Sequence, residues 1–385
     1  MNLFRRCQNV YNTLHIISLL PANMETKAIG AILGCMSGDV LGACVEGWPA
    51  EKIHTVFPKG LQDFQDHARG FGRYTDDTQM TLALGQSIID AGKVDPAQAA
   101  LAYASSFDIA RGYGGMTINV LSHLRQTRGS DWQTAASRYI PGEGSYGNGA
   151  AMRISPVGIA YRNAPPDVLH RAVRSSCVPT HTHPIAIDGA FVLAAAIGWL
   201  MHRQPAVTYV EKRTIQDSLL EYLMSIAQTV EMRSKLRLLA IGLIYLPEPV
   251  ECWETHLTSL AWRKECALQL ELAEGNPFQI KADSAVAVAL CAFLHHGTQS
   301  CPFSHNTFVA ACHYGGDTDT IAAMAGACWG ALHGYDMLPK HWIRDLENSK
   351  MGRFDAIQMG CRLAKCDIKS DDDVNVDYVD YMECV

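Results

Sequence analysis

One stretch constrains the fold most strongly: the sequence Gly-Gly-Asp-Thr-Asp-Thr at 315–320, which an uncharged run at 321–332 follows. The run is rich in alanine, glycine and larger apolar residues, as is typical of a helix buried on all sides. Asp317 and Asp319 stand at its N-terminal end, where one carboxylate can cap a helix and complement its dipole. Two carboxylates beside an apolar helix repel each other unless a cation lies between them. Because the nearby ligand atoms are all oxygens, a hard divalent cation is the natural candidate.

A second stretch has the same pattern: Tyr-Thr-Asp-Asp-Thr at 74–78 precedes apolar residues at helical spacing over 79–90. Helix capping alone explains each of the two clusters about as well as ligand binding does. The two clusters lie roughly 240 residues apart and supply complementary sets of oxygen ligands. Together they predict one site that holds two metal ions, typically about 3.5–4 Å apart.

A third stretch, Gly-Glu-Gly-Ser-Tyr-Gly-Asn-Gly at 142–149, is a glycine-rich loop. The backbone N–H groups of such a loop are free to face an anion at the start of a following helix. It is not a Walker A loop, because no Lys-Ser or Lys-Thr pair follows its last glycine. A plain surface turn is the alternative.

The N-terminal part of the domain is expected to be a helix over 25–47 with glycines at every fourth position from 30 to 42. Such a stripe lets a second helix approach closely, and packing is its simplest explanation. Asp39 lies among apolar residues and needs a partner. Glu46 precedes Gly-Trp-Pro at 47–49, an exit into a loop whose backbone could carry the carboxylate over a pocket. Residues 50–73 could be a mobile cover or an ordinary connection.

Strand-like alternation is almost absent, so we expect an all-α protein. The expected fold is a single compact orthogonal bundle of a dozen or more helices, with a dimetal site at helix N-termini. The polar stretch 205–281 contains no recognisable chemistry. Further helices are expected at 78–91, 96–110, 116–127, 185–202, 211–230, 256–274 and 283–295.

The ends of the chain differ from the domain expected at 25–366. Residues 1–24 carry Arg5 and Arg6 without an acidic residue, which fits either a mitochondrial transit segment or an extension before an internal start at Met24. Residues 367–385 form an acidic tail. The longest apolar run, 189–201, is shorter than the ~18 residues of a membrane span, so no membrane is expected.

Composition narrows the functional classes. The net charge of −7 disfavours a nucleic-acid surface. The thirteen cysteines form no CxxC pair, which indicates reduced, mostly buried thiols. An EF-hand is excluded, because the loop at 315–320 lacks the glycine and the final glutamate of that motif. A two-metal phosphohydrolase and a non-catalytic binder with a metal-held pocket stay open as alternatives.

The motifs at 74–78, 315–320 and 145–149, together with the spacing Gly38-Asp39-x-x-Gly42-x-x-x-Glu46, closely resemble the ADP-ribosyl-acceptor hydrolases. These are all-α dimagnesium enzymes related to the dinitrogenase reductase-activating glycohydrolases. The resemblance extends from about residue 27 to 345. Because Arg-Gly-Tyr-Gly at 111–114 also matches, the branch that cleaves serine linkages and poly(ADP-ribose) looks nearest.

The resemblance implies a set of site residues and a cofactor of two Mg²⁺ ions, with Mn²⁺ or Ca²⁺ as substitutes. Glu46, Asp317 and Asp319 are the implied catalytic residues, and Glu46 is similar to a mobile acidic residue of the family. The implied metal ligands are Thr75, Asp76, Asp77, Asp317, Asp319 and Thr320. The implied substrate-binding residues are Gly144, Ser145, Tyr146, Gly147, Asn148 and His181.

The function implied by the resemblance is removal of ADP-ribose from modified protein side chains, first of all from serine. Poly(ADP-ribose) and O-acetyl-ADP-ribose are further expected substrates, and ADP-ribosyl-arginine is the alternative linkage. The protein is expected to be a monomer that meets ADP-ribosylated protein or polymer in the DNA damage response. Its expected location is the cytoplasm and nucleus, with the mitochondrial matrix as a further destination.

Elementary chemistry supports the assignment of these roles to these residues. The five carboxylates of the two clusters and Glu46 roughly neutralise two divalent cations. Cleavage of a bond to ribose develops positive charge at C1″. Two metal ions can hold the ribose diol, fix its geometry and lower the pKa of a bound water.

Overall fold

The computed structural model describes residues 22–249, 253–300 and 304–370, and the fold within them is all-α. These residues contain eighteen α-helices, three short 3₁₀ helices and no β-strand. The expected helical bundle is therefore confirmed. The N-terminal extension and the acidic tail lie almost entirely outside the described residues and stay predictions.

The helices of the first half differ widely in length. Their bounds are α2 Met24–Gly42, α3 Ala50–Val56, α4 Asp76–Ala91, α5 Pro96–Ser106, α6 Gly115–Gln126, α7 Ala135–Tyr139, α8 Ser155–Ala160, α9 Pro166–Cys177 and α10 Pro184–Met201. Those of the second half are α11 Tyr209–Ile226, α12 Val230–Tyr245, α13 Trp253–Leu257, α14 Leu260–Leu272, α15 Ala282–His296, α16 Asn306–His313, α17 Thr318–His333, α18 Lys340–Asp345 and α19 Arg353–Lys365. The 3₁₀ helices are η1 Ile109–Arg111, η2 Asn148–Ala150 and η3 Tyr335–Met337.

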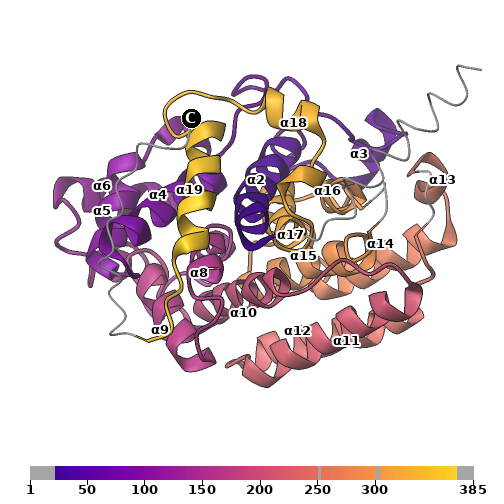
Figure 1. Cartoon of the computed structure of the whole chain (residues 1–385). Coiled ribbons are helices and arrows are strands. Elements are labelled where there is room, and N and C mark those ends of the chain that lie inside the picture. Colours follow the sequence, from indigo (N-terminus) through magenta and orange to yellow (C-terminus); the bar gives the residue numbers. More distant parts are fainter. Residues whose placement is uncertain (1–21, 250–252, 301–303, 371–385) are drawn as a thin grey trace, which may run out of the picture.

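The centre of the bundle is the antiparallel pair α2 and α17, and the other helices surround it (Figure 1). The glycine stripe of α2 faces this partner. A Cβ atom built on Gly34 would lie 2.1 Å from the backbone oxygen of Gly326, and one on Gly38 would lie 2.0 Å from that of Ala322. The two backbones therefore touch directly, which confirms the packing explanation of the stripe. This contact brings the N-terminal end of α17 beside the C-terminal end of α2.

We expect Gly34→Ala to destabilise the protein by about 1–3 kcal/mol, because its methyl group would press on backbone that cannot rotate away. Urea unfolding followed by circular dichroism measures this change. Gly115→Ala is the matched control, because a Cβ atom there meets nothing within 4 Å. Its effect should be a stabilisation of about 0.4–1 kcal/mol. A Gly34→Ala variant as stable as the wild type would contradict the close packing.

Several predicted helix boundaries were wrong, and local caps explain the differences. The helix expected at 211–230 ends at Ile226, and a separate helix, α12, follows, because Thr229 caps its N-terminus by accepting from the Met232 N–H. The helix expected at 256–274 is split into α13 and α14, with Ser259 as the cap of α14.

Two further helices are shorter than expected. The helix predicted at 25–47 ends at Gly42 and continues as turns, and the helix predicted at 96–110 ends at Ser106.

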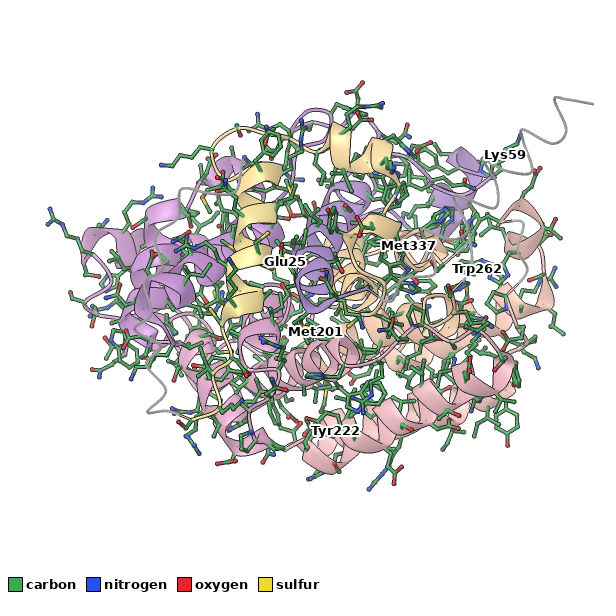
Figure 2. The ribbon with its side chains drawn as sticks, in the orientation of Figure 1. Glu25, Lys59, Met201, Tyr222, Trp262 and Met337 are labelled. Carbon is green, nitrogen blue, oxygen red and sulfur yellow. The ribbon has the colours of Figure 1, made fainter. Side chains whose placement is uncertain are left out.

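One helix in the described residues, α10, is long and apolar enough to cross a membrane by length and composition alone. It contains the run 189–201, which by itself is too short, and extends it to 18 residues. However, 89% of this helix is buried inside the bundle. Its place in the core accounts for its apolar composition. Figure 2 shows how densely side chains fill the space between the helices.

Candidate active site

The N-termini of α4 and α17 open onto one cavity of about 450 Å³. The two acidic clusters, far apart in the chain, therefore meet in the structure as predicted. Five carboxylates line this cavity: Glu46, Asp76, Asp77, Asp317 and Asp319.

Capping does not explain these carboxylates. The N-cap residues of α4 and α17, Thr75 and Asp317, make no side-chain cap hydrogen bond. Asp39 of α2 takes that role for α4, because its carboxylate accepts from the backbone N–H groups of Thr75, at 2.9 Å, and Thr78, at 3.0 Å. The sequence indicated only that Asp39 needs a partner. The contact joins residues 36 positions apart, which no local pattern reveals.

The carboxyl groups of the cavity have raised pKa values, so their joint ionisation requires added positive charge. Burial, followed by repulsion from Asp39, raises the pKa of Asp76 to about 8. Burial and the neighbouring carboxylates, Asp39 first, hold the pKa of Asp77 well above its usual range. The pKa of Asp319 is raised in the same way, with Asp77 as its strongest neighbour. Groups of like charge in a buried site cannot all ionise unless a cation joins them.

The donor set fits a hard divalent cation. Asp77 Oδ1 is buried and has no hydrogen-bond partner among the described residues. One carboxylate oxygen each from Asp39, Asp77 and Asp319 lies within 4.8 Å of the others. Oxygen-rich sites of this kind suit Mg²⁺ or Ca²⁺.

The two threonines predicted as metal ligands lie differently. Thr320 lines the cavity, and its backbone N–H donates to Asp319 Oδ1 at 2.9 Å. Thr75 lies behind the cavity wall, where its hydroxyl is 2.8 Å from Asp39 and 3.0 Å from Asp77. Its oxygen therefore also orients the two carboxylates next to it. The assignment of both threonines as ligands stays a prediction.

The glycine-rich loop forms another part of the wall, and all five of its predicted binding residues, 144–148, line the cavity. A short antiparallel bridge holds the loop in place, with Asn148 N–H donating to the Ile280 carbonyl at 2.8 Å. Asn148 Nδ2 also donates to Asp317 Oδ2 at 2.5 Å, which ties this wall to the acidic one. The 3₁₀ helix η2 covers the last residues of the loop, and the following α-helix, α8, begins only at Ser155.

His181 lines the same cavity, whereas His183 does not. Burial, with the nearby Arg153, lowers the pKa of His181 to about 3, so the ring is neutral. Arg153 donates to the Thr180 hydroxyl at 2.7 Å, and that hydroxyl lies 2.8 Å from His181 Nδ1. In the tautomer in which Nδ1 accepts from the Thr180 hydroxyl, Nε2 carries the proton and can donate to a ligand. His183 instead caps α10, as its accepted bond from the Ile185 N–H shows.

Glu46 lies on the turn after α2, at the edge of the cavity, with 38% of its side chain exposed. Its carboxylate pairs with Arg69 at 3.4 Å, so the segment 50–73 contributes a cation to the mouth of the site. Burial raises the pKa of Glu46, and Asp317 adds to this while Arg69 opposes it. The adjacent backbone is tied to the loop before α17, because Gly47 N–H donates to the Gly316 carbonyl at 2.8 Å. The expected movement of Glu46 over the cavity stays a prediction.

Arg111, part of the motif at 111–114, does not line the cavity but contacts the segment that leads into the carboxylates of α4. Its guanidinium pairs with Glu347 at 2.5 Å and donates to the Tyr74 carbonyl at 2.8 Å. It also lies over the Tyr74 ring, 3.8 Å from the centroid. These two contacts hold Tyr74, the residue directly before Thr75, in place. Glu347 had no recognisable signal in the sequence, because its partner lies 236 positions away.

Known proteins resemble this chain over most of its length. The family model described as ADP-ribosylglycohydrolase matches residues 20–371. The chain is 30% identical to ADP-ribosylhydrolase ARH3 of Bos taurus over 344 residues, which covers 83% of this chain and 90% of that protein. It is 28% identical to ADP-ribosylhydrolase ARH3 of Homo sapiens over 343 residues, with 83% and 90% covered.

A solved structure described as an ADP-ribosylglycohydrolase-related protein complex has the same fold. Its TM-score to this chain is 0.65 at 24% sequence identity, and the match covers 90% of this chain and 99% of that one. At this identity the likeness supports the fold alone.

Proposed function

The chain belongs to the ADP-ribosylglycohydrolase family and is a glycosidase-type ADP-ribosylhydrolase, and from this premise we propose that it releases ADP-ribose O-linked to serine in a Mg²⁺-dependent reaction. One observation carries the proposal. The carboxylates at the N-termini of α4 and α17 line the same cavity as the glycine-rich loop. The name ARH3 of the curated relatives supports the same branch.

The metal-binding half of the proposal assigns roles to the acidic wall. Two Mg²⁺ ions, when bound, supply the positive charge that holds the ribose diol and lowers the pKa of the attacking water. Asn148 and Thr75 keep the flanking carboxylates in place through the hydrogen bonds described above. The residues that would hold the ions are Thr75, Asp76, Asp77, Asp317, Asp319 and Thr320.

The substrate-binding half assigns the diphosphate to the glycine-rich loop. A cavity of about 450 Å³ is within the usual range for small ligands. The loop needs no lysine, because free backbone N–H groups accommodate phosphate oxygens. His181 offers a neutral N–H on the same cavity.

The chemical step requires a proton to move as the bond to C1″ breaks. Positive charge develops at C1″, and the leaving serine oxygen must gain a proton. Glu46 is the carboxylate at the mouth of the cavity, where the modified serine and the attacking water would meet. It can take the proton of the attacking water and return it to the leaving group.

The proposal is tested with a panel of serine-linked, arginine-linked and polymer-linked ADP-ribose. We expect free ADP-ribose from the serine-linked peptide at the highest rate. Preferential cleavage of the arginine linkage would overturn the serine assignment. Release of AMP or phosphate would favour a phosphohydrolase, and binding without product would favour a non-catalytic binder.

The glycine-rich loop yields a separate prediction. We expect Gly147→Val to weaken ADP-ribose binding by at least about tenfold, which is the effect of losing roughly 1.4 kcal/mol. The reason is bulk alone: Gly147 has an ordinary φ of −66°, and a Cβ atom there already lies 3.2 Å from the Ser145 hydroxyl.

Calorimetry of ADP-ribose and of Mg²⁺ binding to the Gly147→Val variant checks this. Mg²⁺ affinity should stay near the wild-type value and serves as the internal control. An unchanged affinity for ADP-ribose would show that the loop is a surface turn and does not bind the diphosphate.

A further inference from the structure

A second buried cluster of ionisable side chains lies outside the catalytic cavity, in a region where the sequence showed no chemistry. It joins His256 of α13, Glu265 of α14, and His295 and His296 at the end of α15. Their exposed fractions are 0%, 0%, 3% and 7%. Trp262, labelled in Figure 2, belongs to the aromatic side chains packed around it. Two of its members, His256 and Glu265, lie in the stretch 205–281, whose sequence contains no recognisable chemistry.

Three imidazoles surround one carboxylate oxygen. The Nε2 atoms of His256 and His295 each lie 3.5 Å from Glu265 Oε2. The Nε2 atom of His296 lies 3.1 Å from the same oxygen. The Tyr314 hydroxyl donates to the other oxygen, Oε1, at 2.5 Å.

His296 Nε2 also lies 2.9 Å from Glu265 Oε1, a hydrogen-bond distance, but the separations of His256 and His295 suit ligands of one metal ion better than hydrogen bonds. An N–H···O hydrogen bond is about 2.7–3.2 Å long, so separations of 3.5 Å are too long for it. Ligand atoms on a tetrahedral zinc ion, with bonds of about 2.0–2.1 Å, lie roughly 3.3–3.4 Å apart. One ligand atom each from His256, Glu265 and His296 lies within 4.8 Å of the others.

The charge of the cluster points the same way. The Glu265 carboxylate is fully buried, and its neighbours are the Tyr314 hydroxyl and three imidazoles. The basic side chains within 4 Å of Glu265 in the described part of the chain are all histidines. A buried carboxylate needs a cationic partner, and a divalent ion supplies one.

We propose that His256, Glu265 and His296 bind one structural Zn²⁺ ion, separate from the acidic catalytic site. His295 is the candidate for the fourth ligand, because its Nε2 faces the same oxygen and has no hydrogen-bond partner among the described residues. Imidazole nitrogens select Zn²⁺ over Mg²⁺, whereas the oxygen ligands of the catalytic cavity select the reverse.

The position of this site gives it a structural task. It would join α13, α14 and α15, whose ligand residues are 40 positions apart at the extremes. Tyr314 connects it to the catalytic loop, since it precedes Gly315 and stacks on Trp262 with ring centroids 5.6 Å apart. Zn²⁺ binding should therefore stabilise the segment that presents Asp317.

The full-length protein is stripped with a chelator, saturated with Mg²⁺ and titrated with Co²⁺, a spectroscopic substitute for Zn²⁺. We expect one equivalent of Co²⁺ to give the intense visible bands of a four-coordinate site with imidazole ligands, and Zn²⁺ to abolish them. Zn²⁺ should also raise the melting temperature by more than about 4 °C. Wild-type protein that shows no such bands and no Zn²⁺-dependent shift would overturn the proposal without any variant.

Variants then assign the ligands. His256→Asn combined with His296→Asn should retain less than about a tenth of the Zn²⁺ affinity. His341→Asn is the matched control, because His341 also pairs with a carboxylate, Asp63 at 2.6 Å, but on the surface. Asp317→Ala should keep the Co²⁺ bands. Bands that survive in the double histidine variant, or disappear in Asp317→Ala, would place the ion elsewhere and refute the site.

Discussion

Replacing Asp77 by alanine should lower turnover by at least about 100-fold while the helical fold survives. Asp77 lies in the first turn of α4 with one oxygen, Oδ1, that no described residue partners. Its loss removes a negative charge from the centre of the acidic wall, so Mg²⁺ affinity should fall together with turnover. Alanine favours the helix, so the change should leave α4 in place.

The measurement is ADP-ribose release from a serine-linked peptide at increasing Mg²⁺ concentration, with circular dichroism to check the fold. Asp90→Ala is the matched control on the same helix, because Asp90 is exposed and hydrogen-bonds only to Gln86 within the described residues. That variant should behave as the wild type. Wild-type turnover of Asp77→Ala at micromolar Mg²⁺ would show that Asp77 is not a ligand.

Replacing Glu46 by glutamine should lower the rate of the chemical step by about 10²–10⁴-fold, the usual contribution of a positioned acid or base. Glutamine keeps the size of the side chain and can still accept a hydrogen bond from Arg69, but it cannot carry a proton. Binding of ADP-ribose should persist, because Glu46 lies at the edge of the cavity and not in the glycine-rich loop.

Single-turnover hydrolysis isolates this step from product release. Glu51→Gln is the control, because Glu51 is an exposed carboxylate on the nearby helix α3. It should leave the rate unchanged. A Glu46→Gln rate within about threefold of the wild type would remove Glu46 from the mechanism, since a positioned acid or base contributes far more.

The sequence predicted those features whose signals are local. The apolar run after 315–320 and the glycine stripe of α2 each indicated a buried helix, and both helices are at the core. The two acidic clusters were expected to meet because each stands at a helix N-terminus with complementary ligands. Their convergence on one cavity follows that expectation.

The features that the sequence did not reveal depend on contacts between distant residues. Asp39 supports α4 from another helix, and Glu347 supports Tyr74 through Arg111. The histidines around Glu265 come from two other helices, and each is unremarkable in its own segment. Helix boundaries failed where a single Thr229 or Ser259 hydroxyl caps a helix inside an otherwise continuous polar pattern.

The most direct test of the central claim follows ADP-ribose release from a serine-ADP-ribosylated peptide by metal-stripped protein as Mg²⁺ is added. Burial and mutual repulsion raise the pKa values of Asp77 and Asp319, so cations are needed before the carboxylates of the cavity can all be ionised. We therefore predict no release in chelator and a rise to full activity that saturates with Mg²⁺, with free ADP-ribose as the product. Full activity in chelator, or no ADP-ribose at any Mg²⁺ concentration, would contradict the account.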